Sequence, residues 1–253
     1  METTAMARGL VLVEDSPKRI RVLLGGEWIA DSQNVKLVWE KPYYPTYYIP
    51  AADVRTDLLV DTGETRRSPS RGTSAVNDIK VGDRVVEGAA SWYHEAEIDE
   101  IVDHVRLHWP AMDGWFEEDE EVFVHARDPY KRIDILQSSR HVVVEVDGEV
   151  VADSTSTRML FETELPTRYY FPKTDLRMDL LAPTETETAC PYKGTASYYK
   201  VTVDGTAHED IAWWYPSPLR ESERIAGYVA FYNEKVDLII DGERLERPKT
   251  KFS

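Results

Sequence analysis

The sequence has very little cysteine and no long apolar run. Cys190 is the only cysteine among 253 residues. A single thiol excludes a disulfide within the chain and excludes a zinc site built from several cysteines. No apolar stretch approaches the ~20 residues that a membrane-spanning helix needs, so we expect no membrane partner.

Basic residues are few beside acidic ones. The chain has 30 Lys and Arg against 46 Asp and Glu, which gives a formal net charge of -16. Such a surface repels phosphate backbones, so we expect no nucleic-acid partner. A glycine-rich phosphate loop and a metal-binding carboxylate pair are also missing, so we expect no cofactor and no metal. Residues 1–14 lack the pattern of a signal peptide, which makes the cytoplasm the expected compartment.

The sequence does contain an internal repeat. Glu40 and Tyr47 recur as Glu162 and Tyr169, each 122 residues later. A fixed interval of this size predicts two copies of one domain. Apolar residues mostly alternate with polar ones, so the predicted class is all-β with about eight strands per copy and little helix.

The repeat also sets expected boundaries. We expect a disordered or loose N-terminus over residues 1–15, a first domain over 16–125, a linker over 126–137 and a second domain over 138–253. Each half has roughly the size at which a domain folds on its own. The two halves are expected to pack together as a pseudo-dimer.

Local patterns predict particular elements. Gly25-Gly26 and Asp147-Gly148 suit two-residue hairpin turns, because positive φ costs little at such residues. Residues 175–180 alternate between charged and apolar, as on a half-buried strand, with an Asp–Arg–Asp row of structural ion pairs.

The secondary structure of four further segments can be predicted. Residues 225–232 and 236–240 read as the two strands of a closing hairpin, and residues 97–103 as a short helix. Asp61-Thr62-Gly63 matches one half of an aspartic-protease motif. The second copy lacks the other half, so we interpret this segment as a turn.

The first candidate site is an aromatic pocket in the second copy. Its expected lining is Arg168, Tyr169, Tyr170, Lys193, Trp213, Trp214 and Tyr215, with Glu162 at the edge. Neighbours on a strand point to opposite faces, so only about half of the rings can line one cleft. The alternative is that these rings form the core between two sheets. The first copy has Thr46 in place of Arg168, so a single site is expected in the second copy.

The second candidate is a catalytic site with Cys190 as a nucleophile and with Glu162 as a further catalytic residue. Lys193 follows three residues later, and a nearby cation lowers the pKa of a thiol. The alternative is a small residue at a turn, because the first copy has Ser68 at this position. The third candidate is a partner-binding surface on the loop 110–118, where Trp115 and Phe116 are expected to be exposed.

Several blocks of the second copy resemble one bacterial family. They are FETELPTRYYFPKTDLRMDL at 161–180, CPYKGTA at 190–196, DIAW at 210–213 and GYVAFYNEKVD at 227–237. This pattern is similar to the domain-of-unknown-function family 427, and HARDPY at 125–130 is similar to the linker of its tandem form.

The resemblance implies two tandem β-tent domains, each made of two antiparallel sheets pinned together at one end. Similar folds hold a structural zinc with paired cysteines, which a chain with one cysteine cannot do. The family has also been labelled nucleotidyltransferase-like, but no motif in this sequence supports that label. We therefore expect a protein that binds a small molecule or peptide in an aromatic-lined cleft, mainly in the second copy. An enzyme acting on a small metabolite and a structural or protein-interaction module are the alternatives.

Overall fold

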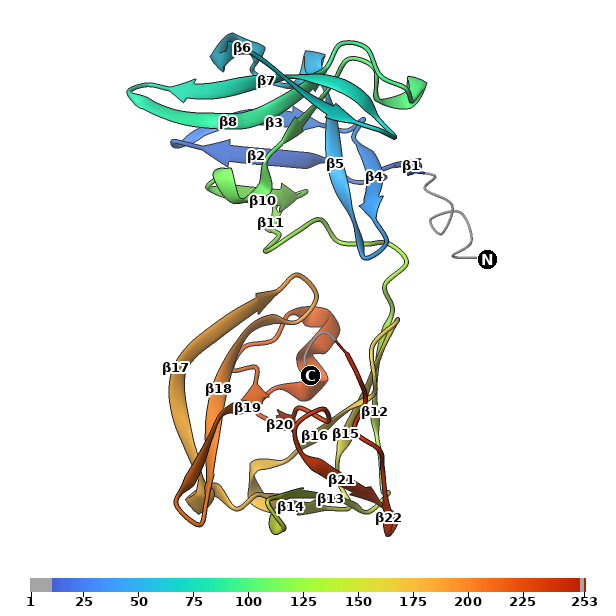
Figure 1. Ribbon diagram of the computed structural model, residues 1–253, viewed down its shortest axis with the longest axis vertical. Helices are drawn as coiled ribbons and strands as arrows, with labels where there is room; N and C mark the ends of the chain where they lie inside the picture. The colour runs from blue at the N-terminus through green and yellow to red at the C-terminus, as the bar shows by residue number, and fades with distance from the viewer. Residues whose placement is uncertain (1–10, 251–252) are drawn as a thin grey trace. The chain divides into compact units, whose positions relative to one another are not determined.

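The computed structural model of the protein describes residues 11–250 and Ser253. The chain divides into two compact units between Asp128 and Pro129, and each unit holds one copy of the repeat (Figure 1). Within the described residues each unit has eleven strands, and the helices are short 3₁₀ helices. None of these helices is long and apolar enough to cross a membrane. The all-β prediction is confirmed, with four antiparallel sheets arranged as one pair per unit.

The first unit pairs a seven-stranded sheet with a four-stranded sheet. The larger sheet has the order β1 (Leu12–Asp15), β4 (Lys36–Lys41), β5 (Tyr44–Pro50), β9 (His104–Leu107), β8 (Arg84–Tyr93), β7 (Gly72–Val81) and β6 (Leu59–Ser68). The smaller sheet has the order β11 (Glu120–Glu121), β10 (Gly114–Glu117), β2 (Ile20–Leu24) and β3 (Glu27–Ser32).

The second unit repeats this topology. Its larger sheet has the order β12 (Ile133–Gln137), β15 (Arg158–Glu162), β16 (Arg168–Phe171), β20 (Val229–Phe231), β19 (Thr206–Trp214), β18 (Gly194–Val203) and β17 (Leu181–Cys190). Its smaller sheet has the order β14 (Glu149–Ser154), β13 (Val142–Val146), β21 (Asp237–Ile240) and β22 (Glu243–Arg244). The shared order lets each position of one unit be matched to a position of the other.

The start of each unit holds an edge strand. Most of the N-terminal segment expected to be loose, residues 1–10, lies outside the described residues, and Leu12–Asp15 form β1. Residues 133–137 of the expected linker form β12. Both strands pair along one side only, with β4 and β15.

The predicted hairpin turns are confirmed. Gly25 and Gly26 have φ of 61° and 80°, and Asp147 and Gly148 have φ of 51° and 85°. Positive φ at both central residues gives a turn whose twist matches that of the flanking strands. The pairs β2–β3 and β13–β14 follow in antiparallel register.

The prediction of a strand over residues 175–180 is wrong. The segment forms the 3₁₀ helices η6 (Lys173–Asp175) and η7 (Met178–Leu180), which match η2 (Ala51–Asp53) and η3 (Thr56–Leu58). Six alternating residues cannot separate a strand from two helical turns, because each turn spans only three residues. The expected ion pairs are present between Arg177 and Asp179 and between Arg55 and Asp57.

The closing hairpin expected over residues 225–240 is also wrong. β20 pairs with β16 and β19 in the larger sheet, whereas β21 pairs with β13 in the smaller one. The residues between these strands therefore join the two sheets. Apolar alternation identifies a strand but carries no information about its partner.

Two shorter predictions need correction. In residues 97–103 the helix is a single 3₁₀ turn, η4 (Asp99–Ile101), matched by η8 (Arg220–Ile225). Asp61-Thr62-Gly63 lies inside β6 rather than at a turn between strands. The register of β6 shifts between Asp61 and Thr65, and Gly63 has φ of 73°, so this segment is a β-bulge.

Each larger sheet has two buried faces. The core face packs against the smaller sheet; in the second unit it includes Tyr169 and Phe171. The opposite face, called here the outer face, carries Tyr170 in the second unit and Tyr48 in the first, each in a separate apolar cluster. Adjacent residues of β16 thus belong to different clusters, as the alternation of side chains along a strand requires.

Candidate functional site

The predicted rings divide between the two faces of the larger sheet in the second unit. Tyr170, Trp213 and Tyr215 lie in the cluster on the outer face. Tyr169 and Trp214 belong to the core between the sheets. Some of the rings are therefore core, and the others form a separate cluster on the outer face.

Strands β16 and β19 bring the outer-face rings together. Trp213 donates its indole N–H to the Tyr170 hydroxyl at 3.1 Å, and the two rings meet edge-to-face at 6.2 Å between centroids. Edge-to-face packing places the positive ring edge against a negative ring face. Burial raises the pKa of Tyr170 and of Tyr215, so both phenols are protonated at neutral pH.

Arg168 lies beside these rings in a buried ion pair. Its guanidinium donates to both carboxylate oxygens of Glu234, at 2.6 and 2.8 Å, and the two side chains are 8% and 0% exposed. The same guanidinium lies over the rings of Trp213 and Tyr232. Burial disfavours the Glu234 carboxylate, but the hydrogen bonds from Arg168 and Thr250 outweigh it and lower its pKa. Sequence reasoning missed Glu234, because nothing in a β pattern links residues 66 positions apart.

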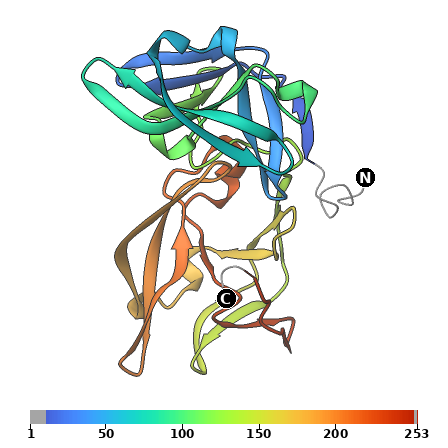
Figure 2. The same cartoon turned by 45° about the horizontal axis from the view of Figure 1, so that its top comes forward.

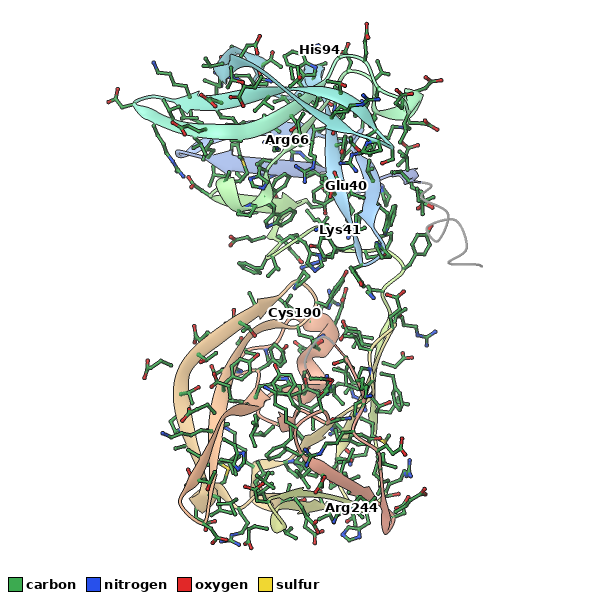
Figure 3. All side chains as sticks on the ribbon, viewed as in Figure 1. Glu40, Lys41, Arg66, His94, Cys190 and Arg244 are labelled. Carbon is green, nitrogen blue, oxygen red and sulfur yellow. The ribbon has the colours of Figure 1, made fainter. Side chains whose placement is uncertain are left out.

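Lys193 and Glu162 form a second pair. The lysine Nζ donates to Oε2 of Glu162 at 2.6 Å, and the side chains are 11% and 8% exposed. Lys193 lies in the turn between β17 and β18, directly before Gly194. Cys190 is the last residue of β17 and is half-buried (Figure 3). Its thiol is close enough to Tyr170 to contribute to the raised pKa of that phenol.

The outer face of the first unit keeps a glutamate, a basic residue and two tyrosines at matching positions. Glu40, Tyr48, Arg71 and Tyr93 stand where Glu162, Tyr170, Lys193 and Tyr215 stand in the second unit. The Tyr48 hydroxyl donates to Glu40 at 2.8 Å, and Arg71 approaches the other oxygen of that carboxylate at 3.6 Å. An acid, a base and two phenols therefore recur at one place in both copies.

Two pockets formed by described residues lie in the first unit, and neither contains a residue of the aromatic site predicted in the second copy. One, of about 340 Å³, includes Trp109, Trp115, Phe123 and Val124 in its wall. The other, of about 370 Å³, lies beside Lys36 and His104. The rings on the outer face of the second unit are instead packed against one another.

The expectation that Trp115 is exposed is wrong. Its side chain is 3% exposed and stacks on Trp109 at 4.5 Å between ring centroids. Trp115 belongs to β10 and pairs with Val22, which points it into the core. Among the residues described, no group of three His, Cys, Asp or Glu side chains is placed to hold a metal ion.

Comparison with known proteins gives one family. No curated protein matches the chain. The family model described as a domain of unknown function, DUF427, matches twice, at residues 12–118 and 134–242. The two matches cover most of the chain and follow the two copies of the repeat. The chain therefore belongs to the DUF427 family, as a tandem of two such domains.

Proposed function

We propose that the outer face of the second unit binds a small polar molecule that carries no net charge. The observation that supports this is that two of the cations beside the ring cluster already have a buried carboxylate partner. Arg168 is paired with Glu234, and Lys193 with Glu162. An ionic ligand would have to break one of these pairs and leave a buried charge alone, which is costly.

An uncharged ligand avoids that cost. It can lie against the flat faces of Trp213 and Tyr232 and exchange hydrogen bonds with phenol hydroxyls. The hydroxyls of Tyr198 and Tyr232 are 3.4 Å apart, and that of Tyr198 is 2.8 Å from Thr188. A peptide that presents an uncharged polar side chain offers the same groups.

The segment after β22 covers part of this face. The chain returns from β22 towards the middle of the second unit (Figure 1 and Figure 2). Thr250 then donates to Oε1 of Glu234 at 2.6 Å, on the carboxylate that holds Arg168. A ligand of this face competes with the segment 245–250, which must move aside for it.

Native mass spectrometry of the full chain tests the proposal. We expect a retained small molecule that disappears on Trp213→Ser, which installs the Ser91 of the first copy. Trp214→Leu is the matched control, since its ring lies on the core face of the same strand. Circular dichroism must show both variants folded. A molecule retained equally by wild type and Trp213→Ser would contradict the proposal, as would a folded wild-type protein that neither retains a molecule nor gains one from a fragment library.

An enzyme that uses Cys190 is the second candidate. Cys190, whose side chain is half-buried, is the last residue of β17. Lys193 lies in the turn that follows and pairs with Glu162 of β15. If the thiol is a nucleophile, iodoacetamide should alkylate the folded protein faster than free cysteine, and Lys193→Met should slow the reaction. A thiol that stays unmodified until the protein is unfolded would remove this candidate.

A further inference from the structure

The two copies differ most on the outer face beyond the shared residues. The matching strand registers allow a direct comparison, because Ala75 pairs with Trp92 as Ser197 pairs with Trp214. The first copy has Arg66, Ser74, Ser91, Arg106 and His108 where the second has Thr188, Ala196, Trp213, Ala230 and Tyr232. Rings and small residues in one copy thus correspond to cations and hydroxyls in the other.

Strand register brings these polar residues together in the first unit. Arg66 on β6 is opposite Ser74 on β7, and Ser91 on β8 is opposite Arg106 on β9. Directly opposite residues have Cβ atoms ~4.5–5.5 Å apart and point to the same face. His108 is two residues beyond Arg106, and its imidazole is close enough to Arg106 and Arg66 for both cations to lower its pKa, after burial as the larger cause.

The cations outnumber the acids on this face. The carboxylate of Glu40 forms ion pairs with both Arg106, at 2.8 Å, and Arg71, at 3.6 Å. Among residues 11–250 and Ser253, the Arg66 guanidinium has no ion-pair partner. Within the part of the chain that the structure describes, the buried Nε–H of Arg71 has no acceptor, which costs free energy unless an acceptor is bound. The hydroxyl-bearing residues Ser74 and Ser91 are buried beside these cations.

We propose that the outer face of the first unit is an oxyanion site, which takes the phosphate or carboxylate group of a small molecule between Arg66, Arg106 and His108. Guanidinium groups suit this ligand, because their planar fork donates two parallel hydrogen bonds to two oxygens of one anion. The chain carries a net charge of -16, so a local excess of cations does not follow from its composition. The glutamate present neutralises one of the two arginines that contact it, which leaves positive charge for the ligand.

The site should bind anions more tightly as the pH falls. The groups that face His108 are Arg66 on β6 and Arg106 on β9, with Arg71 and Glu40 close to Arg106. In the free protein burial, and then the two arginines, disfavour a charged imidazole. A bound anion offsets that repulsion and raises the pKa of His108, so binding takes up a proton. By linkage, lower pH then favours binding.

Titration calorimetry of the full chain with inorganic phosphate, and separately with succinate, tests the site. We expect saturable binding of at least one anion, weakened roughly tenfold or more by Arg66→Thr and by Arg106→Ala. Each variant installs the residue of the second copy. Arg67→Ala is the matched control, because Arg67 is an exposed cation on the same strand whose side chain points to the opposite face.

The outcomes separate clearly. Binding of phosphate alone identifies a phosphoryl ligand, binding of succinate alone a carboxylate ligand, and binding of both a general oxyanion site. The proposal is overturned if neither anion binds saturably, or if Arg67→Ala weakens binding as much as Arg66→Thr. Arg66 is exposed, so the Arg66→Thr variant is expected to fold, which circular dichroism can check. Trp213→Ser in the second unit should leave phosphate affinity unchanged, which keeps this test separate from the proposed function.

Discussion

At the level of single residues, Arg168 and Glu234 form an ion pair that is more deeply buried than that of Lys193 and Glu162. Both side chains are almost fully removed from water, and the guanidinium meets the carboxylate through two hydrogen bonds. The desolvation of two charges offsets much of their attraction, so an intact buried pair contributes little net stability. Removal of one partner is different, because the remaining charge keeps its desolvation cost and loses its compensation.

Arg168→Met should therefore destabilise the second unit by about 3–5 kcal/mol. The double variant Arg168→Met/Glu234→Leu should recover much of that loss, because no unpaired charge remains. Urea unfolding of the four proteins in the double-mutant cycle measures both effects. A single variant that costs less than about 1 kcal/mol would show that water reaches the pair.

The pH dependence of stability should report Glu234. Its pKa in the folded protein lies below the ordinary value of 4.5. A lowered folded pKa means that the contribution is complete above the unfolded pKa and is lost as the pH falls through the folded pKa. The free energy of unfolding should thus decrease below about pH 4.5 more steeply in the wild type than in Glu234→Gln. Equal slopes between pH 7 and pH 3 would contradict this assignment.

The sequence predicted the rings of this site but not the partner of Arg168. Neighbouring residues of a strand were expected to point to opposite faces, and Trp213 and Trp214 do belong to different clusters. The partner of Arg168 could not be predicted, because Glu234 follows a strand whose sheet was wrongly assigned. The pattern gives the face of a residue, whereas the contact depends on which strands are neighbours.

Among the elements, the turn that carries the basic residue is built alike in both copies. Gly72 and Gly194 have φ of 91° and 94°. The carbonyl before each glycine, on Arg71 or Lys193, accepts a backbone hydrogen bond from the loop after β8 or β19. A Cβ on Gly72 would lie 2.9 Å from the backbone nitrogen of Glu97. This close approach of the backbone holds Arg71 against the loop after β8.

Gly72→Ala should therefore destabilise the first unit more than Gly63→Ala does. Gly63 has φ of 73°, and no atom lies within 4 Å of the place that an alanine methyl would take, so alanine there meets only the left-handed backbone cost of about 1–2 kcal/mol. At position 72 a clash with rigid backbone adds roughly 1–3 kcal/mol. Thermal unfolding of both variants gives the difference. Equal losses would mean that the loop after β8 moves freely.

At the same scale, the errors of sequence reasoning have a common cause. Tight turns were predicted correctly, because Gly25-Gly26 and Asp147-Gly148 satisfy a local backbone requirement. The 3₁₀ helices η6 and η7 were missed, because six residues hold too few repeats to fix a period. Local chemistry identifies a turn, but sheet membership depends on contacts far along the chain.

At the scale of the whole molecule, we propose that each compact unit folds on its own and that the boundary between them lies between Asp128 and Pro129. The first unit needs residues beyond its last strand. Asp128 accepts a buried hydrogen bond from the indole N–H of Trp39 at 3.2 Å, and Arg127 lies 3.7 Å from the carboxylate of Glu117. Ala126 belongs to the apolar core of that unit. These contacts support the proposal that residues 126–128 belong to the first domain rather than to a linker.

A fragment of residues 1–128 should consequently fold alone, with the cooperative unfolding expected of a small domain. A fragment of residues 1–125 should be less stable by at least about 1–3 kcal/mol, because a buried indole N–H loses its acceptor and the core loses a side chain. Urea unfolding followed by tryptophan fluorescence compares the two fragments. If both are equally stable, residues 126–128 contribute nothing to the first unit; if neither folds, the units depend on each other and the proposed boundary fails.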